Sequence, residues 1–108
     1  MLYKLSLTDV TTGGNNTAVG KSSASNTTTA DYNTALGYQA LFTNTTGGSN
    51  TAVGKNALVS STTASTNTAV GADSQANTTT GTDNTSVGYA SLDANTTGND
   101  NTAVGDHA

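Results

Sequence analysis

The side chains that could do acid–base or metal chemistry are few in this sequence. A single histidine, His107, stands beside Asp106, and the chain of 108 residues has no cysteine. A histidine can act as a general base or a metal ligand, but a solvated residue near the end of the chain is the simpler interpretation of His107. We therefore predict no catalytic residue from it, and disulfides are excluded.

The carboxylates show no arrangement that would support catalysis or repeated metal binding. A repeated calcium site needs aspartates in register beside glycine, and cleavage of a polysaccharide needs clustered carboxylates. The seven aspartates share no single spacing; they are Asp9, Asp31, Asp73, Asp83, Asp93, Asp100 and Asp106. One site near Asn99-Asp100-Asn101 is conceivable, but turn chemistry explains these residues more simply. We expect no enzyme, no metal and no cofactor.

Charge and hydropathy exclude two kinds of partner. The formal net charge is −4, arginine is absent, and the only lysines are Lys4, Lys21 and Lys55. This leaves no basic patch for nucleic acid. No segment approaches the length of a membrane span, and residues 1–7 have no apolar run long enough for a signal peptide.

Aromatic side chains are the remaining candidates for recognition. Tyr32, Tyr38, Phe42 and Tyr89 are expected to point outward, where they could form a strip that binds a sugar or a receptor. Packing between the chains of an oligomer is the alternative. The Asn-x-Thr sequons at Asn15, Asn26 and Asn44 are expected by chance in a chain so rich in Asn and Thr.

A repeat of 17 residues organises the whole sequence. It is defined by the pattern Asn-Thr-(Ala/Ser)-(Val/Leu)-Gly. Position one is Asn16, Asn33, Asn50, Asn67, Asn84 and Asn101; position four is Val19, Leu36, Val53, Val70, Val87 and Val104; position five is Gly20, Gly37, Gly54, Gly71, Gly88 and Gly105. Position eight is always small, position nine is mostly Leu with Ala24 and Gln75 as departures, and positions thirteen and fourteen are a Thr pair.

The repeat predicts one all-β domain over residues 1–108. A partial coil covers residues 1–15, and units begin at residues 16, 33, 50, 67, 84 and 101. Only 32% of the residues are hydrophobic, which would also fit a disordered linker. A fixed period without insertions instead indicates that each unit meets its neighbours in one geometry.

Residue types favour a parallel β-solenoid, or β-roll, of about six coils. Thr and Val suit strands, and side chains of a strand alternate between its faces. Positions two and four should therefore share one face, and positions one and three the other. We predict Val and Leu inside each coil, a ladder of stacked Asn side chains, a turn or close approach at position five, and a second short strand at positions seven to nine.

So thin a core predicts an oligomer. Two large aliphatic residues in each coil contribute about 3–6 kcal/mol on burial, whereas ordering the backbone costs about 1–2 kcal/mol per residue. Pairing through the small Ala/Ser faces would add burial. Neither end of the sequence looks like a cap, so we expect either a piece of a longer fibre or a subunit that stacks end to end into a filament.

The motif also resembles a known group of repeats. Asn33-Thr34-Ala35-Leu36-Gly37-Tyr38-Gln39-Ala40-Leu41 is similar to repeats in phage tail fibres and related bacterial surface proteins, and to the head repeats of trimeric autotransporter adhesins. The resemblance implies a left-handed parallel β-roll in a homotrimer. It further implies an extracellular, cell-surface or virion location, and a role in attachment or shaft extension.

Ice binding is the alternative function. Regular solenoids with ranks of Thr can match a lattice. Positions twelve and fourteen give Thr-x-Thr at Thr27–Thr29 and Thr78–Thr80, and position two offers a full Thr rank that we expect to point inward. A flat Thr face on a monomer would favour ice, and an oligomer that hides its small-residue face would favour a fibre.

Overall fold

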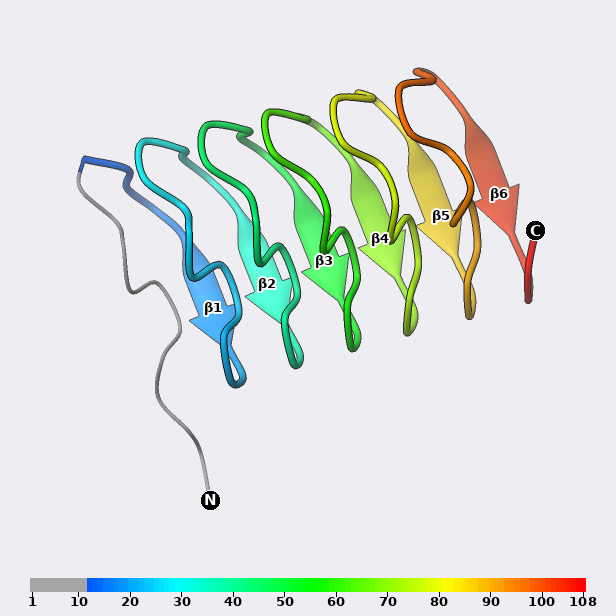
Figure 1. The fold of residues 1–108 in the computed structure, drawn as a ribbon, viewed down its shortest axis with the longest axis horizontal. Helices are drawn as coiled ribbons and strands as arrows, with labels where there is room; N and C mark the ends of the chain where they lie inside the picture. Colours follow the sequence, from blue (N-terminus) through cyan, green and yellow to red (C-terminus); the bar gives the residue numbers. More distant parts are fainter. Residues whose placement is uncertain (1–11) are drawn as a thin grey trace.

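The chain forms a parallel β-solenoid with one short strand in each turn. A computed structural model describes residues 12–108. Its strands are β1 (Thr17–Val19), β2 (Thr34–Leu36), β3 (Thr51–Val53), β4 (Thr68–Val70), β5 (Thr85–Val87) and β6 (Thr102–Val104). They lie side by side in one sheet in chain order (Figure 1). The predicted all-β solenoid is confirmed, and most of the predicted partial first coil lies outside the described residues.

Every pair of neighbouring strands has the same register. Thr17 pairs with Thr34, Thr34 with Thr51, and the pairing continues in steps of 17 residues to Thr102. Identical repeat positions therefore lie above one another at the strand spacing of ~4.8 Å. The longest dimension is 33 Å.

The side chains alternate as predicted, but the face expected to be inside is the outer one. Ala52 at position three is 0% exposed, whereas Val19 is 42% and Val104 71% exposed. Asn50 shares the inner face with Ala52. The reason is the asparagine: both polar groups of its amide find partners inside the coil, and alternation then turns Thr and Val outward. The prediction that Val lies inside was wrong.

The second half of each unit consists of turns, so the second strand predicted at positions seven to nine was also wrong. Gln39 and Leu41 have φ values of 55° and 53°, in the left-handed region, and Asn56 and Leu58 repeat this pattern at 57° and 53°. Alternate left-handed residues turn the chain too sharply for a strand. The backbone still bonds from coil to coil, as from the Leu41 N–H to the Ala57 carbonyl at 3.0 Å.

Glycine at position five is required by both its conformation and its surroundings. Gly54 has a φ of +134°, and a Cβ added there would lie 2.5 Å from the carbonyl oxygen of Gly71 in the next coil. No side chain fits such a contact, and few residues other than glycine adopt that φ. The turn and close approach predicted at this position are both present.

The core is narrow and partly polar. Leu41 and Leu58 at position nine pack against the alanines of position three. Position twelve also faces inward, so Thr27 and Thr78 are fully buried while Thr29 and Thr80 are exposed. The predicted Thr-x-Thr pairs therefore do not form one face.

Two departures from the repeat meet inside the solenoid. Gln75 replaces Leu at position nine, and Ser86 in the next unit is the Ser at position three. The Gln75 Nε2 donates to the Ser86 Oγ at 3.0 Å and to the Thr68 carbonyl at 2.9 Å. Ser86 also shares a hydrogen bond with the Ser74 hydroxyl. The polar substitution in one coil is thus partnered by the polar substitution in the next, although the Gln75 Oε1 is buried without a partner.

Replacing all three polar side chains of this contact should stabilise the protein. Replacing every partner of a buried polar contact with apolar groups is neutral or favourable, while removing one partner leaves a buried group unsatisfied. We expect Ser86→Ala alone to lower the free energy of unfolding by about 1–2 kcal/mol, because the Ser74 hydroxyl loses its partner. The triple variant Ser74→Ala/Gln75→Leu/Ser86→Ala should raise it by about 1–2 kcal/mol, since Ala57 and Leu58 occupy the first two positions one coil earlier. Urea unfolding followed by circular dichroism measures both, and a triple variant less stable than the parent would contradict this account.

Candidate functional site

No enclosed site is found in the part of the chain that the structure describes. Residues 12–108 contain no pocket and no group of three or more His, Asp or Glu side chains able to hold a metal ion. Within the same residues, no helix is long and apolar enough to cross a membrane. The candidate functional features are therefore the ladder that joins the coils and the surfaces that the coils present.

The position-one asparagines form the ladder, and each bonds to the backbone of the next layer. The Asn50 Oδ1 accepts the backbone N–H of Asn67 at 3.0 Å, and the Asn50 Nδ2 donates to the Ala64 carbonyl at 2.8 Å. The first bond recurs along the series from Asn16 to Asn101 at 2.9–3.0 Å. The second recurs from Asn16 to Asn84 at 2.7–2.9 Å.

This geometry differs from the stack of amides that the sequence suggested. A side-chain to side-chain bond between ladder asparagines is present at the last rung, from the Asn101 Nδ2 to the Asn84 Oδ1 at 2.9 Å. Elsewhere the side chain clamps the backbone at the start and the end of a unit. Asparagine suits this position because one small side chain supplies both a donor and an acceptor.

A second ladder, which the sequence analysis did not identify, uses threonine hydroxyls at position thirteen. The Thr45 Oγ1 donates to the Thr62 carbonyl at 3.0 Å, and Thr28, Thr62 and Thr79 repeat this bond at 3.1–3.2 Å. The sequence shows the Thr pair at positions thirteen and fourteen, but we assigned it no hydrogen-bonding role. The signal that could have revealed the ladder is that position thirteen is Thr in every unit that includes it, which indicates that each coil needs the same hydroxyl there.

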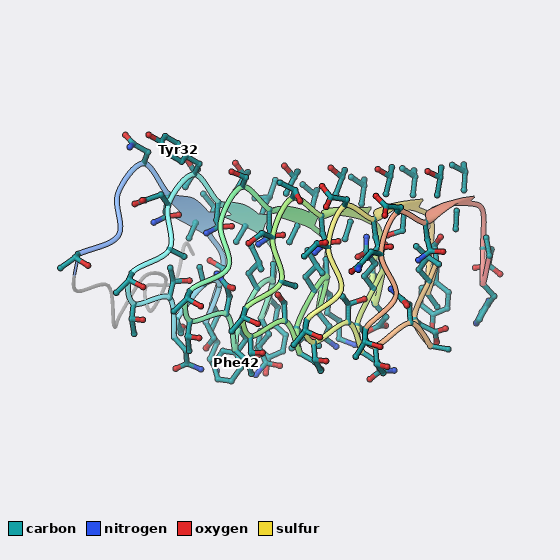
Figure 2. All side chains as sticks on the ribbon, turned by 90° about the horizontal axis from the view of Figure 1, so that it is seen from above. Tyr32 and Phe42 are labelled. Carbon is teal, nitrogen blue, oxygen red and sulfur yellow. The ribbon has the colours of Figure 1, made fainter. Side chains whose placement is uncertain are left out.

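The outward side chains of positions two and four cover the sheet; we call this the sheet face. It carries one rank of Thr and one rank of Val or Leu, and no charged residue occupies either position. Figure 2 shows these side chains in a row above the strands. The Thr rank therefore points outward, contrary to our prediction, while the small side chains of positions three and eight lie inside the coil.

The four aromatic residues do not form one strip. Tyr38 and Tyr89 both occupy position six of the repeat, whereas Tyr32 occupies position seventeen. All three are exposed, and Phe42 is half-buried. In Figure 2, Tyr32 and Phe42 lie on opposite sides of the stack. A ligand could not contact all four residues together, so any recognition surface must be smaller than the predicted strip.

The ionisable groups with shifted pKa values lie on the surface. The His107 Nδ1 is 2.9 Å from the Asp106 Oδ2, and this hydrogen bond and the carboxylate charge raise the pKa of His107. The His107 ring also meets Tyr89 edge-on, with ring centroids 5.2 Å apart. Hydrogen bonds from Thr66 and Thr82 lower the pKa of Asp83. These contacts account for the shifts as local surface pairs.

Comparisons with protein-family models, with curated proteins and with solved structures find no match to this chain.

The asparagine ladder should be essential for stability. Asn50→Ala leaves a buried N–H and a buried carbonyl without partners, at about 1–3 kcal/mol each. We expect a loss of about 2–5 kcal/mol in the free energy of unfolding, measured by urea unfolding. Asn77→Ala is the matched control, because Asn77 is exposed and should change this free energy by less than about 0.5 kcal/mol. Equal effects of the two substitutions would contradict the assigned role of the ladder.

Proposed function

We propose that this chain is a structural segment of an extended fibre, of the kind found in phage tail fibres and bacterial surface adhesins. The observation that carries the proposal is the uniform register from β1 to β6. Each coil offers the next the same strand pairing and the same asparagine hydrogen bonds, so the stack can be lengthened without changing how coils meet. A regular rod of this kind suits shaft extension and the display of surface groups.

The sheet face is the surface that we propose for contact between chains. The pairing predicted through the small Ala/Ser positions cannot occur as described, because those side chains are buried within each coil. The sheet face instead presents a continuous Val/Leu rank with Val19, Leu36, Val87 and Val104 at least 40% exposed. We propose a homotrimer in which the Val/Leu ranks of the three chains face one another. We also propose that the coils of each chain are left-handed. The location of this homotrimer would be extracellular, on a cell surface or on a virion.

Sedimentation equilibrium over a concentration series tests the assembly. We expect a single species of three times the chain mass. Val53→Asp/Val70→Asp should reduce it to a monomer, because burying unpaired carboxylates in the contact is costly. Thr63→Asp/Thr80→Asp adds the same charges at exposed positions away from the sheet face and should leave the mass unchanged. A parent protein that stays monomeric would contradict the trimer, and open-ended growth would indicate a filament subunit.

Ice binding is the second candidate, and the outward Thr rank favours it. The hydroxyl and methyl groups of Thr17, Thr34, Thr51, Thr68, Thr85 and Thr102 repeat at the strand spacing of ~4.8 Å on an uncharged sheet. A regular array of this kind can order water in a lattice. The second rank, however, is Val or Leu instead of Thr. A monomer would leave the face free for ice, and a trimer would cover it.

Thermal hysteresis separates the two candidates. If the sheet face binds ice, the parent protein should lower the freezing point below the melting point. Thr51→Lys/Thr68→Lys should abolish this difference between the freezing and melting points, because it places flexible charged side chains in the middle of the Thr array. Thr63→Lys/Thr80→Lys is the control with the same added charge outside the sheet face. A folded monomer without hysteresis would eliminate ice binding.

A further inference from the structure

We propose that Lys21, Tyr38 and Lys55 form a binding site for an acidic polysaccharide. This inference deepens the attachment role of the proposed fibre and rests on it. The three residues occupy position six in three successive coils, directly after the glycine that follows each strand. Both lysines are exposed, and Tyr38 is 44% exposed.

The backbone holds these three side chains in line. The Gln39 N–H donates to the Lys21 carbonyl at 3.1 Å, and the Asn56 N–H donates to the Tyr38 carbonyl at 2.9 Å. Residues at the same position in successive coils are therefore ~4.8 Å apart, and the two lysines are about 10 Å apart with the tyrosine between them. The spacing does not depend on a flexible loop, so the site is preorganised along the solenoid axis.

The charge of the site is distinct from that of the rest of the chain. Lys21 and Lys55 are the two lysines of residues 12–108, and the ion pair found in those residues joins His107 to Asp106. Both ammonium groups are thus available to a ligand. One coil beyond Asn56, Asp73 accepts a hydrogen bond from the Asn56 Nδ2 at 2.9 Å. Its carboxylate borders the site and limits an anionic ligand to the first three coils.

An acidic sugar polymer fits this arrangement. The tyrosine ring offers an apolar face for the C–H groups of a sugar ring and a hydroxyl for hydrogen bonding. A lysine on either side supplies a point charge for a carboxylate or sulfate. Two lysines whose backbones are about 10 Å apart along the axis suit a linear polymer with an acidic group on successive or alternate sugars, because their flexible side chains can adjust to either spacing.

Two other anionic partners fit less well. Proteins that bind nucleic acid through the phosphate backbone make about 6–10 phosphate contacts, and segments that bind acidic membranes carry about 4–8 basic residues. Two lysines in a chain with a net charge of −4 fall below both ranges. A flexible polymer that engages one short site on each chain of a fibre gains avidity from repetition instead.

The chain contains its own control for the site. Tyr89 occupies the same position six and is similarly exposed, but its neighbours at that position are Ala72 and Asp106. The aromatic group is the same and no lysine flanks it. Because the His107 ring packs edge-on against Tyr89, the comparison is made at a pH where His107 is neutral. A ligand that recognises only aromatic rings would bind at Tyr38 and Tyr89 alike, whereas an acidic polysaccharide should select Tyr38.

The proposal is tested by titrating the protein with polygalacturonate, with dextran sulfate and with neutral dextran of similar length. Calorimetry and amide chemical shifts monitor the binding in each titration. We expect both acidic polymers to bind at low salt and to shift the amide signals around Lys21, Tyr38 and Lys55, and neutral dextran not to bind. Tyr38→Ala and Lys21→Ala/Lys55→Ala should each weaken binding at least about tenfold, since they remove the ring or both charges. Tyr89→Ala should leave it unchanged, and Lys21→Arg/Lys55→Arg should retain it.

Four outcomes would overturn the assignment. These are no binding of either acidic polymer, equal binding of dextran, equal loss with Tyr89→Ala, and tighter binding of duplex DNA or of phosphatidylserine vesicles. Sedimentation of the same variants separates this site from the fibre itself, because position six lies outside the sheet face. A trimer that binds no polymer would refute the binding site but not the fibre proposal. A monomer that binds polymer would refute the fibre proposal but not the binding site.

Discussion

The fold depends on one interaction, the clamp that each position-one asparagine forms between successive coils. Its amide holds the N–H of the next asparagine and the carbonyl near the end of its own unit, as at Asn50. Both partners are buried backbone groups that would otherwise lose their hydrogen bonds to water. Because the asparagine must face inward, strand alternation also decides that Ala lies inside and that Thr and Val lie outside.

The clamp also limits the size of the other inward side chains. Coils ~4.8 Å apart leave little space between identical residues, and a Cβ at Gly54 would already collide with Gly71. Alanine and serine fill most inner positions, with a leucine such as Leu58 in the space opposite the strand. Stability therefore comes from many short-range contacts and ladder bonds distributed along the stack, as in other repeat proteins.

The sequence predicts the period, the parallel strands, the alignment of the position-one asparagines in one column and the tight approach at position five, but not that their amides bond to the backbone. It does not predict which strand face is buried, because alternation groups Thr51 with Val53 without saying where they point. The left-handed φ of Leu58 is equally hidden, since leucine has no preference for it. The contact between Gln75 and Ser86 requires both the register and the inner face to be known. The aromatic strip failed for a similar reason: Tyr32 and Phe42 belong to different sides of the coil.

Variation in the sequence follows the division between inner and outer positions. Position one is always Asn and position five always Gly, because every coil must meet the next in the same way. Position six is free of that constraint and holds Lys21, Tyr38, Lys55, Ala72, Tyr89 and Asp106. Each outer position is thus a row in which neighbouring coils can place different groups at a fixed spacing. The two kinds of position therefore have separate effects: the interior sets the distances between the outer side chains, and the choice of residues along one outer row decides which chemical groups the surface presents at those distances.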